Sequence, residues 1–195
     1  MAKKVLVLMG GFSAEREVSL TTGKCVCAAL KKAGYEVVSH DLQNGFELVE
    51  TLKKEKPDVV FNALHGNWGE DGEIQGFLDV LQVPYTHSGL KASVLGMDKS
   101  LTKELASENG IKVPQGEKMT FRKFKAEGTF LKMPYVVKPV SDGSSVGVYI
   151  IRKKEDAEAV RYEDDREILI EEFIDGKELT CMVLGSQAHV VMELR

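Results

Sequence analysis

Lys138 stands just before a glycine- and serine-rich segment with the composition of a phosphate-binding loop. Pro139 follows the lysine, and Gly-Ser-Ser-Val-Gly occupies residues 143–147. Glycines let backbone N–H groups approach an anion closely, and the lysine adds a positive charge nearby. No G-x-x-x-x-G-K-[ST] pattern leads into a helix, so the segment is not a P-loop. It indicates nucleotide binding in another fold, with a plain hairpin turn as the alternative.

Polar residues also follow the first and third apolar runs of the chain. Two glycines and Glu15 come after the first run, and His65 comes after the third, flanked by Gly66. If these runs are neighbouring parallel strands, Glu15 and His65 meet at the carboxyl edge of the sheet over one small polar ligand. The alternatives are helix-dipole pairing for Glu15 and Glu17 and a structural role for His65.

Three further acids have simpler interpretations. Glu70 and Asp71 are expected to cap the helix that follows them. Asp41 ends the second apolar run, where NAD-binding folds place an acidic residue. The second and third glycines of G-x-G-x-x-G are missing, so we do not expect a dinucleotide site.

The second half of the chain has acidic residues at the end of one expected strand and the start of the next. Glu171 and Glu178 flank this turn, with Phe173 between them. A purine needs an acceptor for its amino group, and a ribose needs an acceptor for its hydroxyls, so both acids have a suitable chemistry. Acids beside a turn are also common without any such role.

The first 97 residues alternate expected strands with expected helices. The strands are expected at 5–9, 36–42, 58–64 and 84–86, and the helices at 15–33, 46–54 and around 74–81. This alternation implies a parallel sheet with helices on both faces and ligands at the carboxyl ends of the strands. Periodicity predicts that Val18, Thr22 and Cys25 face the sheet from the first helix, and that Phe46 and Leu52 do so from the second.

The pattern changes after residue 97. A helix is expected over 98–109 and a short one over 155–160, and strands are expected at 135–138, 148–152, 167–174, 178–185 and 189–194. The stretch 118–133 is polar and weakly patterned. This half therefore reads as an α+β domain with an antiparallel sheet.

Composition narrows the class of protein. The 26 Lys and Arg residues are outnumbered by 30 Asp and Glu, which gives a formal charge of −4 and argues against nucleic-acid binding. No apolar stretch is long enough to cross a membrane, and the apolar N-terminal run is short and reads as a buried strand. Three cysteines make no disulfide framework. A cytoplasmic protein with no nucleic-acid or membrane partner is expected.

Six segments together resemble the D-alanine–D-alanine ligase family of the ATP-grasp superfamily. They are Gly-Gly-Phe-Ser-Ala-Glu-Arg-Glu-Val-Ser at 10–19, His-Gly-Asn-Trp-Gly-Glu-Asp-Gly at 65–72, Gly-Met-Asp-Lys at 96–99, Val-Lys-Pro at 137–139, Gly-Ser-Ser-Val-Gly at 143–147 and Glu-Glu-Phe-Ile-Asp-Gly-Lys-Glu-Leu-Thr at 171–180. The resemblance covers nearly the whole chain.

The resemblance implies a fold and a reaction. Residues 1–97 would form an α/β Rossmann-like domain with the first D-alanine site, and residues 98–195 the N-terminal part of an α+β ATP-grasp domain. The reaction would join two D-alanines for peptidoglycan synthesis. ATP would phosphorylate the first carboxylate, and the amine of the second D-alanine would attack the acyl phosphate. A homodimer is expected.

The resemblance also implies roles for single residues. Glu15 would hold the ammonium of the first D-alanine with support from His65, and Ser144 would belong to the network that orients the substrate, so Glu15 and Ser144 are the expected catalytic residues. The expected ATP contacts are Lys99, Lys138, Ser144 and Ser145 at the phosphates, and Glu171, Phe173 and Glu178 at the adenine and ribose. Positioning and electrostatics dominate phosphoryl transfer, so two lysines near moving phosphate charge suit the reaction.

Family members continue well beyond the position of Arg195. The resemblance therefore places the Mg²⁺ ligands past Arg195, assigns no metal ligand within residues 1–195, and predicts that this stretch alone does not turn over. Two alternatives stay open at this point. One is another ATP-grasp ligase, of the type that forms D-alanyl-D-lactate. The other is a truncated module that binds ATP or D-alanine and catalyses nothing.

Overall fold

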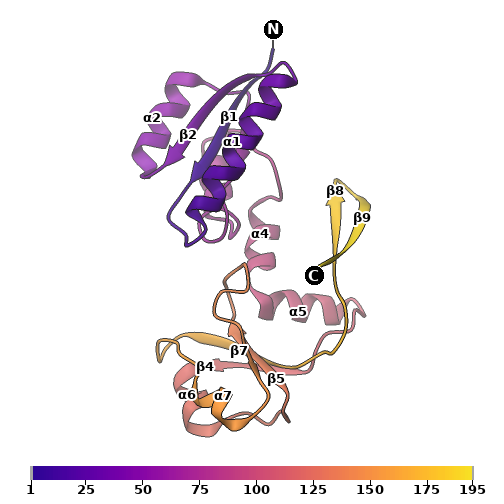
Figure 1. Ribbon diagram of the computed structural model, residues 1–195. Helices are drawn as coiled ribbons and strands as arrows, with labels where there is room; N and C mark the ends of the chain where they lie inside the picture. Colours follow the sequence, from indigo (N-terminus) through magenta and orange to yellow (C-terminus); the bar gives the residue numbers. More distant parts are fainter. Residues whose placement is uncertain (1, 195) are drawn as a thin grey trace. The chain divides into compact units, whose positions relative to one another are not determined.

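The chain folds into two compact units in the computed structural model, which describes residues 2–194 (Figure 1). The first unit comprises Met1–Val113 together with Pro139–Gly147, and the second comprises Pro114–Lys138 together with Val148–Arg195. No helix among residues 2–194 is long and apolar enough to cross a lipid bilayer. The expected functional boundary between residues 97 and 98 stays a prediction.

The first unit alternates strands and helices as the sequence predicts. Its elements are β1 (Lys4–Gly10), α1 (Arg16–Lys32), β2 (Glu36–Leu42), α2 (Gly45–Glu55), β3 (Val59–Asn62), α3 (Glu73–Val80), α4 (Leu90–Met97) and α5 (Lys99–Glu108). The three strands form one sheet in the order β2-β1-β3, and β1 runs parallel to both neighbours. The expected strand at 84–86 is reduced to a single parallel bridge between Tyr85 and Val60.

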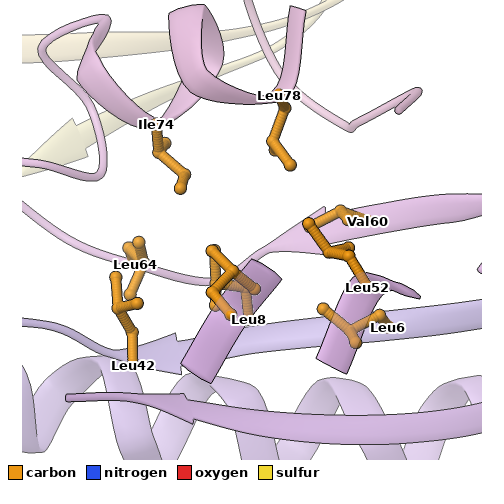
Figure 2. Packing of buried hydrophobic residues seen from close by; sticks show 9 residues of the cluster. Leu6, Leu8, Leu42, Leu52, Val60, Leu64, Ile74 and Leu78 are labelled. Atoms are coloured by element: carbon orange, nitrogen blue, oxygen red, sulfur yellow. The ribbon is translucent and has the colours of Figure 1, made fainter. Parts of the chain in front are cut away.

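The central strand β1 contributes side chains to two cores, because successive residues of a strand point to opposite faces. Leu6 and Leu8 pack with residues of α2 and α3, among them Leu52 and Leu78. Figure 2 shows Ile74 and Leu78 of α3 directed toward this cluster. Val5, Val7 and Met9 belong to the other cluster, against which α1 packs. The parallel sheet is therefore covered on both faces, as expected.

The inward face of α1 was wrongly predicted by one position. Val18 is 54% exposed and Cys25 is exposed, whereas Ser19 and Gly23 are buried. A Cβ atom at Gly23 would lie 2.6 Å from the Cβ of Met9. At this point the helix comes so close to β1 that only glycine fits, while Leu20, Val26 and Leu30 pack on the same cluster from other turns of α1. The buried face therefore lies one position away from the face that apolar periodicity indicates.

Helix α2 uses a different apolar residue from the one expected. Phe46 is 86% exposed, and Leu48 is buried together with the expected Leu52. The helix begins after Asn44, whose side-chain oxygen accepts a hydrogen bond of 2.9 Å from the Glu47 N–H. Phe46 lies two positions before Leu48, so its side chain points to the opposite side of the helix from the buried pair Leu48 and Leu52.

The second unit is built on antiparallel pairs. Its elements are β4 (Gly116–Thr120), α6 (Phe121–Glu127), β5 (Tyr135–Pro139), β6 (Tyr149–Ile151), α7 (Lys154–Glu158), β7 (Glu167–Glu172), β8 (Glu178–Leu184) and β9 (Gln187–Leu194). One sheet has the order β4-β7-β5-β6, and β8 and β9 form a two-stranded sheet. The pairs β4–β7, β5–β6 and β8–β9 are antiparallel, which confirms the expected character of this half.

Neither β4 nor α6 was expected from the weakly patterned stretch 118–133. Phe121 and Phe124 are the two buried residues of α6, and they pack in one cluster with Tyr135 and Ile168. Thr120 caps the helix by accepting a hydrogen bond from the Lys123 N–H. Two apolar anchors in a seven-residue helix are too few to produce a visible period.

Candidate active site

The turn after β1 is fixed by an ion pair between Arg16 and Asp41. The guanidinium donates from Nη1 and Nη2 to the two carboxylate oxygens at 2.8 Å and 2.7 Å, and from Nη1 to the Gly11 carbonyl at 3.2 Å. The hydrogen bonds from Arg16 hold the pKa of Asp41 below its usual value. A Cβ at Gly10 would lie 2.1 Å from Asp41 Oδ1, so this turn requires glycine. Asp41 is thereby engaged within the fold.

The ends of β1 and β3 meet, as the predicted topology requires. The hydroxyl of Ser13 donates to the His65 carbonyl at 2.7 Å and accepts a hydrogen bond of 3.1 Å from the Glu15 N–H. Thr22 Oγ1 lies 3.0 Å from His65 Nε2, and Glu70 Oε1 lies 3.8 Å from Nδ1. Ser13 therefore holds the backbones of both segments, while Thr22 orients the imidazole ring.

The carboxylate of Glu15 is held between the two loops. The Ser144 hydroxyl donates a hydrogen bond to Glu15 Oε1. A Cβ atom on Gly66, which has a φ of +67°, would lie 2.6 Å from Glu15 Oε2. The close approach and the left-handed backbone both require glycine at this position. Glu15, Ser144 and the segment of His65 are therefore brought together in the first unit.

Ser144 projects from an unusual turn. Ser144 and Ser145 have φ values of +52° and +57°, and the Val146 N–H closes the turn on the Gly143 carbonyl at 3.1 Å. Left-handed conformations are uncommon for residues other than glycine and are found preferentially where function demands them. The strands on either side, β5 and β6, pair as an antiparallel hairpin. The hairpin interpretation is thus right for the strands, and the turn in addition presents a hydroxyl to Glu15.

Lys99 contacts the backbone just before the turn that contains Ser144. It is the first residue of α5, where Asp98 caps the helix by accepting hydrogen bonds from the N–H groups of Ser100 and Leu101. The ammonium donates to the Asp142 carbonyl at 2.5 Å and to the Val140 carbonyl at 3.4 Å. The positive charge is therefore anchored at the base of the glycine-rich loop.

The loop between β3 and α3 uses its acids differently from what was expected. Glu70 Oε2 accepts a hydrogen bond of 2.7 Å from the Gly66 N–H, so Glu70 closes the loop and does not cap a helix. Asp71 Oδ1 accepts a hydrogen bond of 3.1 Å from the N–H of Glu73, the first residue of α3. The N-cap of α3 is Gly72, which has no side chain to cap the helix, so neither acid is the N-cap that was expected. Asp71, one position earlier, binds the first N–H of the helix, and Glu70 does not contact the helix N–H groups in this way.

The remaining expected nucleotide contacts lie in the second unit. Lys138 forms an ion pair with Glu171, whose side chain is only 5% exposed. The Phe173 N–H donates to the Pro134 carbonyl at 3.3 Å, and the Arg152 guanidinium lies 5.0 Å from the centre of the Phe173 ring. Glu178 begins β8 and is exposed. A cation and a carboxylate that suit a nucleotide are therefore paired here, while Glu178 faces solvent.

Sequence reasoning missed the residues that hold these groups in place. Ser13, Arg16 and Thr22 bind other residues of the site, and all three lie in or beside the segment 10–19. The opposite charges of Arg16 and Asp41 were a usable signal, but nothing in the sequence indicates which acid the arginine binds. Among residues 2–194, no group of three or more His, Cys, Asp or Glu side chains is placed to hold a metal ion.

Two family descriptions match this chain. "D-ala D-ala ligase N-terminus" matches residues 43–88, and "D-ala D-ala ligase C-terminus" matches residues 105–195. A curated D-alanine–D-alanine ligase of Paramagnetospirillum magneticum is 48% identical over 196 residues, which cover 100% of this chain and 64% of the relative. The chain belongs to the D-alanine–D-alanine ligase family.

Solved structures of the D-alanine–D-alanine ligase family support the same assignment. The Bacillus anthracis ligase superimposes with a TM-score of 0.83 at 37% identity, over 100% of this chain and 65% of that one. Its structure complexed with ATP gives a TM-score of 0.82 at 35% identity, over 100% and 66% of the two chains. The present chain thus spans less than two thirds of the length of these relatives.

Proposed function

We propose that this chain belongs to an enzyme that ligates two D-alanines to D-alanyl-D-alanine at the expense of ATP, for peptidoglycan synthesis. One observation carries the proposal: the chain aligns over essentially its whole length with curated D-alanine–D-alanine ligases at 44–48% identity. The matched stretch spans Glu15, His65, Lys138 and Ser144, the residues to which the proposal gives roles.

The first D-alanine is assigned to Glu15. Its carboxylate is suited to an ammonium, and Ser144 and Gly66 limit its movement. Charge-assisted hydrogen bonds are the strong ones, so a fixed carboxylate selects a protonated amine. The His65 ring is held by Thr22, and in the proposal it supports the same ligand.

ATP is assigned to the lysines and to the acids of the second unit. The residues fit the molecule chemically, since Lys138 offers positive charge for phosphate and Glu171 is a buried acceptor for an adenine amino group. Lys99 and the Ser144–Ser145 turn would add phosphate contacts from the first unit, while the Phe173 backbone and Glu178 would hold adenine and ribose. The B. anthracis structure complexed with ATP supports use of the nucleotide.

The proposed chemistry has two steps. An oxygen of the first carboxylate attacks the γ-phosphorus of ATP, the bond to the β,γ-bridging oxygen breaks, and ADP leaves. The amine of the second D-alanine then attacks the acyl carbon, loses a proton, and expels phosphate together with that carboxylate oxygen. The fixed lysines offset charge on the moving phosphoryl group, which is the main task of the protein in such transfers.

Several finer statements belong to the same proposal. They are a Rossmann-like first domain ending near residue 97, a homodimer, a cytoplasmic location, and a requirement for Mg²⁺. The described residues offer no cluster that fits Mg²⁺, and we derive no step through the ion.

Kinetics of Glu15→Gln test the proposal, with Glu17→Gln as the matched control. Glu15→Gln keeps the shape of the side chain and removes its charge, so KM for D-alanine should rise at least tenfold, by roughly the 1.5–3 kcal/mol of a charged hydrogen bond, while KM for ATP changes little. Glu17 is an exposed acid of the first turn of α1, and its replacement should leave both values unchanged. A change in KM for ATP alone would contradict the assignment of Glu15.

A further inference from the structure

The loop after β3 contains a strained aromatic residue that the proposed reaction does not use. Trp68 is 49% exposed and has a φ of +71°, a left-handed conformation that bulky residues rarely adopt. The backbone N–H of Trp68 donates a hydrogen bond of 2.7 Å to Asp71 Oδ2, which helps to hold the strained backbone. Strain of this kind persists only where the surroundings enforce it, and it is concentrated at ligand sites and switches.

Trp68 forms a wall of a small cavity of 240 Å³, which we call the Trp68 slot. The ring of Phe12 meets the indole edge to face, with the centroids 5.4 Å apart and the planes at 73°. The apolar residues Leu42, Leu48, Ile74 and Phe77 also line the slot. Phe12 is itself 50% exposed, so the two aromatic rings line the slot and also reach solvent.

Among the described residues that line the Trp68 slot, Glu73 is the only charged one. Its backbone N–H is bound by Asp71, which is a second negative charge beside the slot. Within residues 2–194, no lysine or arginine lies close enough to the Glu73 carboxylate to form an ion pair. An apolar slot with an unneutralised carboxylate is complementary to a ligand with an apolar body and a positive charge.

The size of the slot restricts the ligand further. Pockets for drug-sized molecules usually enclose about 300–1,000 Å³, so the slot suits a single ring rather than a nucleotide. Aromatic faces attract an ammonium group placed over them, which adds to the attraction by Glu73. The matching ligand class is a monocyclic arylalkyl ammonium.

We propose that the Trp68 slot is a second ligand site, which binds a small arylalkyl ammonium against the rings of Phe12 and Trp68 with the charge directed to Glu73. This goes beyond the proposed ligation, because the lining includes neither Glu15 nor His65. A ligand in the slot would still contact the loop that contains His65, since Trp68 and His65 lie in the same connection between β3 and α3.

Titration of tryptophan fluorescence with benzylammonium tests the site. Trp68 is the single tryptophan of the 195 residues, and loss of the signal in Trp68→Phe identifies its contribution. Benzylammonium should give a saturable change in emission. Benzyl alcohol lacks the charge, and propylammonium lacks the ring. Each should bind at least about fivefold more weakly than benzylammonium.

Three variants complete the test of the Trp68 slot. Glu73→Gln, at an exposed position, should weaken benzylammonium binding about fivefold and leave benzyl alcohol unchanged. Phe12→Ala removes a wall and should abolish saturation, while Phe46→Ala, at a residue outside the slot, should not. Equal responses to all three compounds, or an unchanged affinity in Glu73→Gln, would overturn the proposal. Emission that shifts with protein concentration alone would mean that a second copy covers the slot, which would also overturn it.

Discussion

At the scale of single residues, the position of the Glu15 carboxylate depends on the absence of a side chain at Gly66. Gly66→Ala would place a Cβ 2.6 Å from Glu15 Oε2, whereas Gly34→Ala meets nothing within 4 Å, although Gly34 also has a positive φ of 87°. Both variants should lose about 1 kcal/mol of unfolding free energy to backbone strain. Only Gly66→Ala should also raise KM for D-alanine, which steady-state kinetics would detect. An equal effect of the two variants on KM would show that Glu15 is not positioned in this way.

The Lys138–Glu171 pair supports both the fold and nucleotide binding. Lys138→Ala leaves a carboxylate that is 5% exposed without this partner, and should cost about 2 kcal/mol of unfolding free energy. Lys118→Ala is the matched control, because its pair with Glu167 is exposed at 3.2 Å and should contribute less than about 1 kcal/mol. Denaturant unfolding measures both values, and calorimetry should show weaker ATP binding for Lys138→Ala alone. Unchanged ATP affinity would make Lys138 purely structural.

The candidate site was largely predictable at the level of residue types. Glu15 and His65 could be placed at neighbouring strand ends because parallel strands present their carboxyl ends at one edge of a sheet. The contacts of Ser13, Arg16 and Thr22 were not predictable, since a hydrogen bond between distant residues leaves no period in the sequence. The pairing of Lys138 with Glu171 likewise follows from strands that are adjacent in the sheet and 33 positions apart in the chain.

At the scale of elements, the packing of α1 on β1 is limited by Gly23. In a helix interior alanine is usually more stable than glycine by about 1 kcal/mol. At Gly23, however, a Cβ would lie 2.6 Å from Met9 Cβ. Gly23→Ala should therefore destabilise the protein in urea unfolding. Gly96→Ala in α4, where a Cβ meets nothing within 4 Å, should stabilise it by up to about 1 kcal/mol. Stabilisation by both variants would contradict the close approach of helix and strand.

The contact between β2 and α2 should make stability depend on pH. His40 Nδ1 lies 3.0 Å from Thr51 Oγ1, while the buried Nε2 has no hydrogen-bond partner among the described residues. Burial lowers the pKa of His40, against the opposing influence of Glu47 and Asp41. The unfolded chain therefore takes up the proton first, and stability falls as pH drops below about 6.5.

Urea unfolding at about pH 7.5 and pH 5.5 checks the role of His40 in this dependence. The wild-type protein should lose more unfolding free energy between the two values than His40→Gln, which has no titrating ring. Parallel losses in the two proteins would assign the pH dependence to other groups.

Elements whose hydrophobic pattern extends over many residues were predictable. Short elements, and packing faces that are set by steric fit, were not. The strand over 36–42 was expected at the residues that β2 occupies, because its apolar run is bounded by Gly34 and a polar turn. The prediction of the buried face of α1 was wrong because the helix buries Ser19 and Gly23, and a Cβ at Gly23 would collide with Met9. Apolar periodicity does not indicate such a close approach. Helix α6 was missed because seven residues with two buried anchors carry little periodic signal.

At the scale of the whole molecule, each of the two units contains part of the machinery proposed for the reaction. The first unit contains Glu15, His65, Lys99 and the Ser144 turn, and the second contains Lys138 and Glu171. Neither set is sufficient alone, because the amino-acid carboxylate must receive a phosphoryl group from the nucleotide. The central claim is therefore the transfer of the γ-phosphoryl group from ATP to the carboxylate of the first D-alanine.

An oxygen-tracing experiment on the full-length protein tests this claim most directly. D-alanine labelled with ¹⁸O in its carboxylate is incubated with ATP and Mg²⁺, and the released phosphate and dipeptide are analysed by mass spectrometry. The account predicts that phosphate appears only when D-alanine is present, that D-alanyl-D-alanine forms in equal amount, and that the phosphate contains ¹⁸O from the carboxylate. Release of unlabelled phosphate, or release that does not depend on D-alanine, would contradict the account.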